Sequence, residues 1–276
     1  MIRPILRNEL DFVFKLTELE KWGTTREELD DLFYFSPKGF FISETNGILE
    51  GVVSTVFYKS FGFIGNLIVK EQFRNKGIGT KLMEYAINYL LSLKVKSILL
   101  DAVPQMFILY EKFGFKKLCR SLRLEGNKAI ESVNRVRLMT KKDLNQIFKL
   151  DYKIFKGDRS FLIQRRFIQH PELSYTLIHK NKITGYLMSI PKNDLISVGP
   201  WIVDPKELEP HLLLQQLLND MNHQKFRLGM LDCNPKIAKI ISKFNLDEYF
   251  YSIRMIYGKR ITHNKGLFAI AGPDRG

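Results

Sequence analysis

The chain has 276 residues, of which 45% are hydrophobic and 26% are charged, with a formal net charge of +14 at pH 7. This composition is typical of globular proteins and excludes a disordered chain, and the length suits two domains of ordinary size. No apolar run approaches the roughly 20 residues of a membrane-spanning helix, and the first residues carry no apolar signal segment. We therefore expect a cytoplasmic protein with no membrane partner.

The net charge favours anionic partners, but the basic residues are scattered along the chain. The densest cluster runs from Lys116 to Arg123 and lacks the interleaved aromatic residues on which single-stranded bases stack. A solvated basic surface is the better interpretation, and nucleic acid is not an expected partner.

Cysteine and histidine usage predicts neither a disulfide framework nor a metal site. The chain has two cysteines, Cys119 and Cys233, and we expect both to be reduced thiols in or near the core. The five histidines are dispersed without the spacing of metal ligands, so no metal cofactor is expected.

The first half of the chain predicts a mixed α/β unit. After one or two helices, apolar and β-branched runs predict antiparallel strands over residues 39–45, 51–58 and 62–69. From Ile78 the apolar residues take helical spacing, and a strand over residues 97–101, a further helix and a final strand follow. The expected fold class is α/β in the α+β sense, a mostly antiparallel sheet flanked by helices.

A basic turn with two glycines connects the strand ending at Val69 to the next helix. It reads Arg74-Asn75-Lys76-Gly77-Ile78-Gly79-Thr80. The first N–H groups of a helix lack intrahelical partners and carry partial positive charge, so such a turn can hold a phosphate or pyrophosphate. The glycines allow the ligand close to the backbone, and the basic side chains add charge. An ordinary strand-to-helix connection is the alternative.

The sequence also repeats itself. A shift of 134 residues pairs twelve identical residues between positions 3 and 69 and their counterparts, where background composition would give about four. The matches include Phe14-Lys15-Leu16 with Phe148-Lys149-Leu150, Gly51 with Gly185, Gly65 with Gly199, and Ile68-Val69 with Ile202-Val203. Further along, at a shift of 131, Leu100-Asp101 matches Leu231-Asp232. We predict two tandem domains, residues 1–126 and residues 133–276, with a boundary in the polar stretch between them.

The second copy lacks the basic turn. In its place the chain carries three carboxylates, Asp204, Glu207 and Glu209, and no glycine before Gly229. Carboxylates at a helix start repel phosphate, so only the first copy is expected to bind the anionic ligand.

Two motifs resemble a known family. The turn Arg74-x-x-Gly77-x-Gly79, followed about thirty residues later by Leu109-Tyr110-Glu111-Lys112-x-Gly114-Phe115, resembles the GNAT superfamily of acetyl-CoA-dependent N-acetyltransferases. This resemblance spans residues 1 to about 125. The second half is similar to the degenerate companion domain of tandem GNAT proteins, through Gly185-Tyr186, Val198-Gly199-Pro200 and the closing residues 268–273.

The resemblance implies a role for each part of the first motif. The turn from Arg74 to Thr80 would bind the pyrophosphate of coenzyme A. The strand Leu67-Ile68-Val69 would splay from its neighbour and pair with the pantetheine arm, and a backbone N–H near Ile68 or Val69 would polarise the thioester carbonyl. Tyr110 would protonate the departing thiolate. A packing role is the alternative for this tyrosine.

Some positions depart from the family pattern or leave a role open. Val103 stands where many members have an asparagine, while the second copy has Asn234 at that position but Ile241 in place of the tyrosine.

The general base is undecided between water and three carboxylates, Glu44, Glu71 and Asp101. Trp22 and Thr24 either line the amine site or pack in the core, and an intradomain ion pair or helix cap is favoured for Asp158 and Arg159 over a place in the substrate cleft.

The resemblance implies an N-acetyltransferase that moves an acetyl group from acetyl-CoA to a primary amine by direct attack in a ternary complex. Cys119 lies beyond the Gly114-Phe115 turn, so no cysteine of the first copy is placed to carry a covalent acetyl group. The alternative is a non-catalytic acyl-CoA sensor. The acceptor, a small-molecule or peptide amine, and the oligomeric state are left open by the sequence.

Overall fold

The computed structural model describes residues 1–126, 133–221, 225–261 and 265–276. The predicted boundary between the two copies falls in residues 127–132, which lie outside the described residues. The first copy consists of β1 (Ile2–Pro4), α1 (Leu10–Leu19), α2 (Arg26–Phe35), β2 (Phe40–Thr45), β3 (Ile48–Phe57), β4 (Gly62–Val69), α3 (Ile78–Ser92), β5 (Ser97–Ala102), α4 (Phe107–Lys112) and β6 (Lys116–Gly126).

The second copy repeats this order of elements and adds one strand at its end. It consists of β7 (Val136–Leu138), α5 (Leu144–Phe155), α6 (Ser160–Gln169), β8 (Ser174–His179), β9 (Lys182–Lys192), β10 (Leu195–Val203), α7 (Leu212–Asp220), β11 (Phe226–Leu231), α8 (Ile237–Phe244), β12 (Asp247–Gly258) and β13 (Leu267–Ala269). The mixed fold class and the predicted element order are confirmed. The strand predicted over residues 51–58 begins earlier, at Ile48, because it pairs with β2 through a tight turn.

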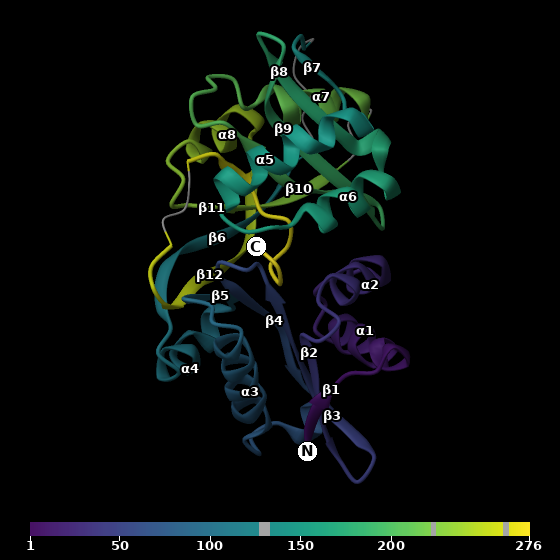
Figure 1. Cartoon of the computed structure of the whole chain (residues 1–276), viewed down its shortest axis with the longest axis vertical. Helices are drawn as coiled ribbons and strands as arrows, with labels where there is room; N and C mark the ends of the chain where they lie inside the picture. Colours follow the sequence, from purple (N-terminus) through teal and green to yellow (C-terminus); the bar gives the residue numbers. More distant parts are fainter. Residues whose placement is uncertain (127–132, 222–224, 262–264) are drawn as a thin grey trace.

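The two copies share one sheet of 13 described strands, twelve of which follow the order β1-β2-β3-β4-β5-β12-β6-β11-β10-β9-β8-β7, while β13 pairs with β10 off this path. The last strand of the order that the copies share is inserted beside the other copy: β12 pairs with β5, and β6 pairs with β11. β6 and β12 also pair with each other, so they form the centre of the molecule, and the two halves extend from them in Figure 1.

A buried ion pair joins the exchanged strands. Asp101 on β5 accepts hydrogen bonds from the guanidinium of Arg254 on β12, and both side chains are 1% exposed. Arg123 on β6 contacts the same carboxylate at 3.3 Å. Three strands from both copies therefore meet at one buried charge.

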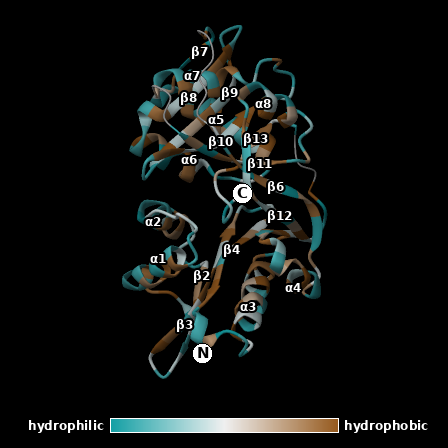
Figure 2. Ribbon diagram, turned by 180° about the vertical axis from the view of Figure 1, so that it is seen from behind, coloured by the Kyte–Doolittle hydropathy of each residue, from teal (hydrophilic) through white to brown (hydrophobic). Residues whose placement is uncertain are grey.

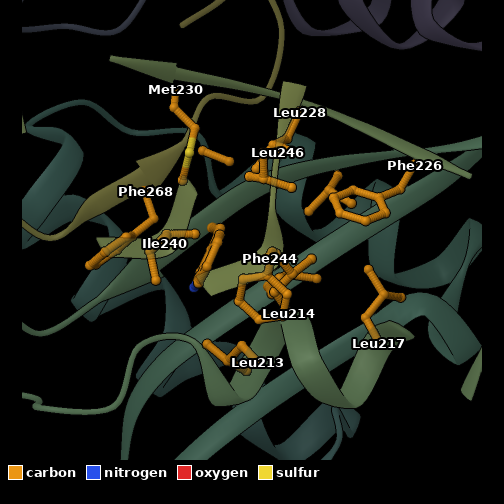
Figure 3. Packing of buried hydrophobic residues seen from close by; sticks show 14 of the residues in the cluster. Leu213, Leu214, Leu217, Phe226, Leu228, Met230, Ile240, Phe244, Leu246 and Phe268 are labelled. Carbon is orange, nitrogen blue, oxygen red and sulfur yellow. The ribbon is translucent and has the colours of Figure 1, made fainter. Parts of the chain in front are cut away.

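Helices cover both faces of each half of the sheet. Strand residues alternate between the faces, so Phe40 and Ile42 join the cluster under α1 and α2, while Phe41 joins the cluster under α3. In the second copy α5 covers one face, and α7 and α8 cover the other. Figure 2 shows hydrophobic residues gathered on the strands, and Figure 3 shows Leu213, Phe244 and Phe268 in the core of the second copy.

Two features of the described residues bear on the expectations from sequence. No helix among them is both long enough and apolar enough to cross a bilayer. Cys119 is buried, whereas Cys233 is exposed and does not belong to the core, although its thiol contacts that of Cys119. Cys233 is the second residue after the end of β11, where the chain turns out of the sheet.

Candidate active site

Strands β4 and β5 run parallel for three residue pairs and then part. Their pairing covers Gly62 to Ile64 on β4 and ends there, although β4 continues to Val69. On its other edge β4 stays paired with β3, except for a register shift next to Asn66. Asn66 has a φ of +48°, and its amide donates to the hydroxyl oxygen of Ser54 at 3.0 Å. This bulge lies just beyond the point at which β4 and β5 stop pairing. We call the place beside the β5-facing edge of β4 beyond it, where no described strand pairs with that edge, the slot.

The end of β4 presents backbone groups to this slot. The N–H of Lys70 donates to the carbonyl of Glu50 on β3 at 2.8 Å. Because successive residues of a strand turn their backbone groups to opposite edges, Ile68 also faces β3, while Leu67 and Val69 face the slot. The carbonyl of Val69 accepts a hydrogen bond from the Arg74 side chain at 3.0 Å.

The basic turn lies at the outer end of the slot. Gly77 is the N-cap of α3 and has a φ of +75°, a conformation that favours glycine. The first bond of α3 runs from Lys81 N–H to the Gly77 carbonyl, so the preceding N–H groups at the helix start lack intrahelical partners. Arg74 forms an ion pair with Glu20, the C-cap residue of α1, which fixes the turn beside β4. The remaining residues of the turn, Asn75, Lys76 and Thr80, are exposed, and Ile78 and Gly79 are half-buried.

Tyr110 is in α4, at the rim of the cluster between the sheet and α3. The same rim includes the half-buried side chains of Leu67 and Val69 from β4, together with Ile78 from α3. Burial raises the pKa of the Tyr110 phenol to about 12, so the group is neutral and carries its proton over the physiological pH range. The structure thus brings the predicted tyrosine to the same side of the sheet as the slot and the turn.

The second copy has the same parting of strands, but its slot is filled. β10 pairs with β11 only as far as Val198, and β13 pairs with β10 beyond that point. The N–H of Val203 donates to the carbonyl of Gly266 at 2.9 Å. Under the 134-residue shift, the paired residues Trp201, Ile202 and Val203 correspond to Leu67, Ile68 and Val69. In the second copy, β13 therefore pairs with the edge of β10 that corresponds to the β5-facing edge of β4. In the first copy, no described strand pairs with that edge of β4 beyond Ile64.

The three carboxylates considered as the general base lie in different environments. Burial alone would raise the pKa of Asp101, but the charges of Arg254 and Arg123 outweigh burial and hold that pKa below its usual value. Both carboxylate oxygens of Asp101 already contact Arg254 or Arg123, in the ion pairs that connect β5 to the exchanged strands β12 and β6. Glu44 forms an ion pair with Arg3 near the sheet edge, at 2.5 Å. Glu71 is exposed in the short turn before Arg74.

On the α1–α2 side of the sheet, the two copies meet between α2 and α6. Trp22, in the loop before α2, is 43% exposed, and Thr24 is half-buried. The Nε atom of Arg165 in α6 contacts Asp31 in α2 at 2.5 Å. A small pocket lies at this junction, and it is lined by Asp31, Arg159, Leu162, Ile163, Arg166, Pro200, Ala271 and Arg275.

The expectation for Asp158 and Arg159 is confirmed. Arg159 forms a buried ion pair with Asp151 of its own copy at 2.8 Å. Asp158 accepts hydrogen bonds from the backbone and side chain of Ser160, at the start of α6. Asp158 also contacts Lys59 of the first copy at 2.9 Å, so it links the copies at the surface.

Sequence reasoning missed the contribution of the last ten residues. Neither the pairing of β13 with β10 nor the contact of Asp274 with Asn66 was predicted, because both depend on residues far apart in the chain. One available signal was Asn66 itself, since a polar residue with a tolerance for positive φ inside an apolar strand indicates a bulge.

In the first copy, a strand that leaves its parallel neighbour, a basic turn at a helix start and a neutral tyrosine at the rim define an acetyltransferase fold of the GNAT type, and the second copy repeats its order of elements and the parting of its strands. Residues 6–115 match the acetyltransferase (GNAT) family, and residues 147–269 match an acetyltransferase (GNAT) domain. The chain belongs to the GNAT superfamily and has its tandem arrangement.

One curated relative is N-alpha-acetyltransferase 30 of Dictyostelium discoideum. It is 30% identical over 94 residues, which make up 32% of this chain and 51% of the relative. The chain thus spans about half the length of the curated relative that it matches.

Solved structures repeat the whole arrangement. A chain from Pyrococcus horikoshii, whose description assigns it to the acetyltransferases, superimposes with a TM-score of 0.85 at 21% identity, over 100% of this chain and 95% of that one. A GCN5-related N-acetyltransferase from Sphaerobacter thermophilus gives 0.66 at 11% identity, over 96% and 97%. A tandem GNAT protein from the clavulanic acid pathway gives 0.65 at 10% identity, over 95% and 99%. At these identities the likeness shows the fold.

Proposed function

We propose that the first copy binds acetyl-CoA and transfers its acetyl group to a primary amine. The observation that carries this proposal is the contrast between the two slots. In the second copy, the residues corresponding to Leu67 and Ile68 pair with an extended segment, β13, and the counterpart of Val69 donates its N–H to the carbonyl just before that strand. The same edge in the first copy has the geometry to pair with an extended pantetheine arm, and the basic turn at its end suits the pyrophosphate.

The proposed chemistry uses two groups of the first copy. The N–H of Val69 faces the slot, whereas that of Ile68 faces β3, so we assign Val69 to the thioester carbonyl as a hydrogen-bond donor. The amine nitrogen attacks the carbonyl carbon, the C–S bond breaks, and the thiolate takes the proton of the Tyr110 phenol. The attacking amine loses its own proton to water, because the geometry of Asp101, Glu44 and Glu71 favours none of them as the base.

The acceptor is proposed to be a primary amine of a small molecule or a peptide. The name of the Dictyostelium relative refers to α-amino groups, which makes peptide N-termini the first acceptors to test. The proposed domains are residues 1–126 and 133–276, and the second copy is proposed to support the first without binding acetyl-CoA, since β13 occupies its slot. A cytoplasmic location stays a prediction.

Calorimetric titration with acetyl-CoA, followed by an acceptor screen, tests this function. We expect one binding site per chain, and we expect Lys76→Glu to weaken binding by about tenfold because it replaces a positive charge beside the pyrophosphate with a negative one. Lys149→Glu, an exposed substitution in α5, is the matched control and leaves affinity unchanged. A wild-type protein that binds no acetyl-CoA contradicts the proposal, and binding without turnover on any amine favours the sensor alternative.

A further inference from the structure

The last residues of the described chain cross from the second copy to the first. After β13, Ile270 N–H donates to the carbonyl of Gly229 on β11 at 2.9 Å. The hydroxyl of Tyr58, the residue after β3, then donates to the carbonyl of Arg275 at 2.6 Å. Figure 1 shows the C-terminus between the two halves, beside β4. We refer to residues 270–276 as the strap.

The strap packs against the bulges of both copies. Gly65 and Gly199 are equivalent under the 134-residue shift, and each stands at the register shift of its strand. A Cβ atom on Gly65 would lie 2.7 Å from the Cα of Asp274, and Gly199 has no room for a Cβ beside the carbonyl of Ile270. One continuous segment therefore contacts the point at which each slot opens.

Asp274 contacts the bulge of the first copy through its side chain. Its Oδ2 accepts a hydrogen bond from the Asn66 amide at 3.3 Å, so this amide is held between Asp274 and Ser54. Asn66 is 4% exposed and Asp274 is 7% exposed. The positive φ of Asn66 is a sparsely populated conformation for a residue with a side chain, and contacts of this kind keep it populated.

The charge of Asp274 is balanced within the strap. The Nε and Nη2 atoms of Arg275 donate to its two oxygens at 2.7 and 3.0 Å. The Nη1 atom of Arg275 donates to the carbonyl of Glu28 at 3.3 Å, which anchors the pair to α2. The carboxylate is therefore fixed by the second copy and by α2, and the Asn66 bulge rests on it.

We propose that Asp274 is a positioning residue for the slot of the first copy. By holding Asn66, it sets the direction in which Leu67 and Val69 leave β5, and hence the fit of the edge to the pantetheine arm. The second copy thus shapes the donor site of the first through the strap. This inference rests on the proposed function, since it concerns the same site.

Two ligands distinguish an effect on the slot from an effect on the basic turn. Acetyl-CoA uses both, whereas adenosine 3′,5′-bisphosphate has no pantetheine arm and uses the phosphate-binding region alone. We expect Asp274→Asn and Asn66→Gly to raise the Kd of acetyl-CoA by about tenfold, or ~1.4 kcal/mol, and to change the Kd of the nucleotide by less than about twofold. Glycine tolerates the positive φ and leaves the Asp274–Arg275 pair in place, so Asn66→Gly tests the contact independently of that ion pair.

Asp158→Asn is the matched control, because it alters another acidic contact between the copies, with Lys59, away from the bulge. It leaves both affinities unchanged. Titrations are made well below the melting temperature of each variant. Unchanged acetyl-CoA affinity in both slot variants, or a parallel loss of both ligands, overturns the positioning role. A wild-type chain that binds neither ligand contradicts the proposed function itself.

Discussion

At the scale of single residues, Tyr110 and the end of β4 carry the proposed chemistry. Their positions agree because both border the same apolar cluster, which also includes the start of α3. Burial of the phenol disfavours the phenolate, so the pKa rises and the acid form is the one present near neutral pH. A proton donor that stays loaded is suited to a leaving thiolate.

Replacing Tyr110 tests this role. We expect Tyr110→Phe to lower kcat by about 100-fold or more, the range of general acid catalysis, with acetyl-CoA affinity unchanged. Tyr89→Phe is the matched control, since Tyr89 is also a half-buried tyrosine at the rim of this cluster, with a pKa raised by burial. Steady-state kinetics and calorimetry measure the two quantities. Equal rates for the two variants would assign Tyr110 to packing.

The pH profile gives a second view of the same residue. Because the pKa of Tyr110 is raised to about 12, nearly all of the phenol keeps its proton at pH 10, and wild-type kcat keeps the contribution of the acid up to that pH. The profile of Tyr110→Phe is expected to be lower but parallel from pH 7 to 10. A decline of wild-type kcat near pH 9 that is absent in Tyr110→Phe would show that the phenol loses its proton there, and it would contradict the raised pKa.

How far the site could be predicted depends on distance along the chain. The basic turn and Tyr110 were visible because each belongs to a short motif with its own spacing. The contact between Asn66 and Asp274 joins residues 208 positions apart, and Asp274 stands in no pattern that distinguishes it from a solvated carboxylate. Local physics thus predicts the anion-binding turn, whereas the support of the bulge becomes visible only in the fold.

At the scale of elements, the exchange of β6 and β12 is the main result that the sequence did not predict. Alternation of apolar residues identifies both strands, but it does not specify the neighbouring strands with which they pair. Either strand could lie in a sheet whose two faces are both covered by helices. The buried group of Asp101, Arg254 and Arg123 adds a specific charge match across β5, β12 and β6.

Asp101→Asn tests the importance of that match. The substitution keeps the size of the side chain but leaves Arg254 buried without a counter-charge, so we expect a loss of about 3–5 kcal/mol in the free energy of unfolding. Chemical denaturation measures it, and Asp158→Asn, in a largely exposed pair, is expected to cost less than about 1 kcal/mol. The folded Asp101→Asn variant should keep the kcat of the wild type. A loss of turnover without a loss of stability would instead indicate that Asp101 is the general base.

At the scale of the whole molecule, we expect the shared sheet to make the two copies one folding unit. Each copy supplies one of the two central strands and lacks the partner that the other provides. β12 covers the edge of β5 from Ser97 to Ala102, and β6 covers β11 along its whole length. Separating the copies therefore exposes two apolar edges and leaves Asp101 without Arg254.

Expressing the copies separately tests this unity. We expect residues 1–126 alone and residues 133–276 alone to lack a cooperative thermal transition, and the two fragments expressed together to form a one-to-one complex that binds acetyl-CoA. The full chain should unfold in a single transition by calorimetry and by circular dichroism. The competing outcome is that β6 moves into the vacant place beside β5 in the first fragment. A cooperative, acetyl-CoA-binding fragment 1–126 would then show that exchange of the strands is dispensable, and the second copy would contribute only the strap.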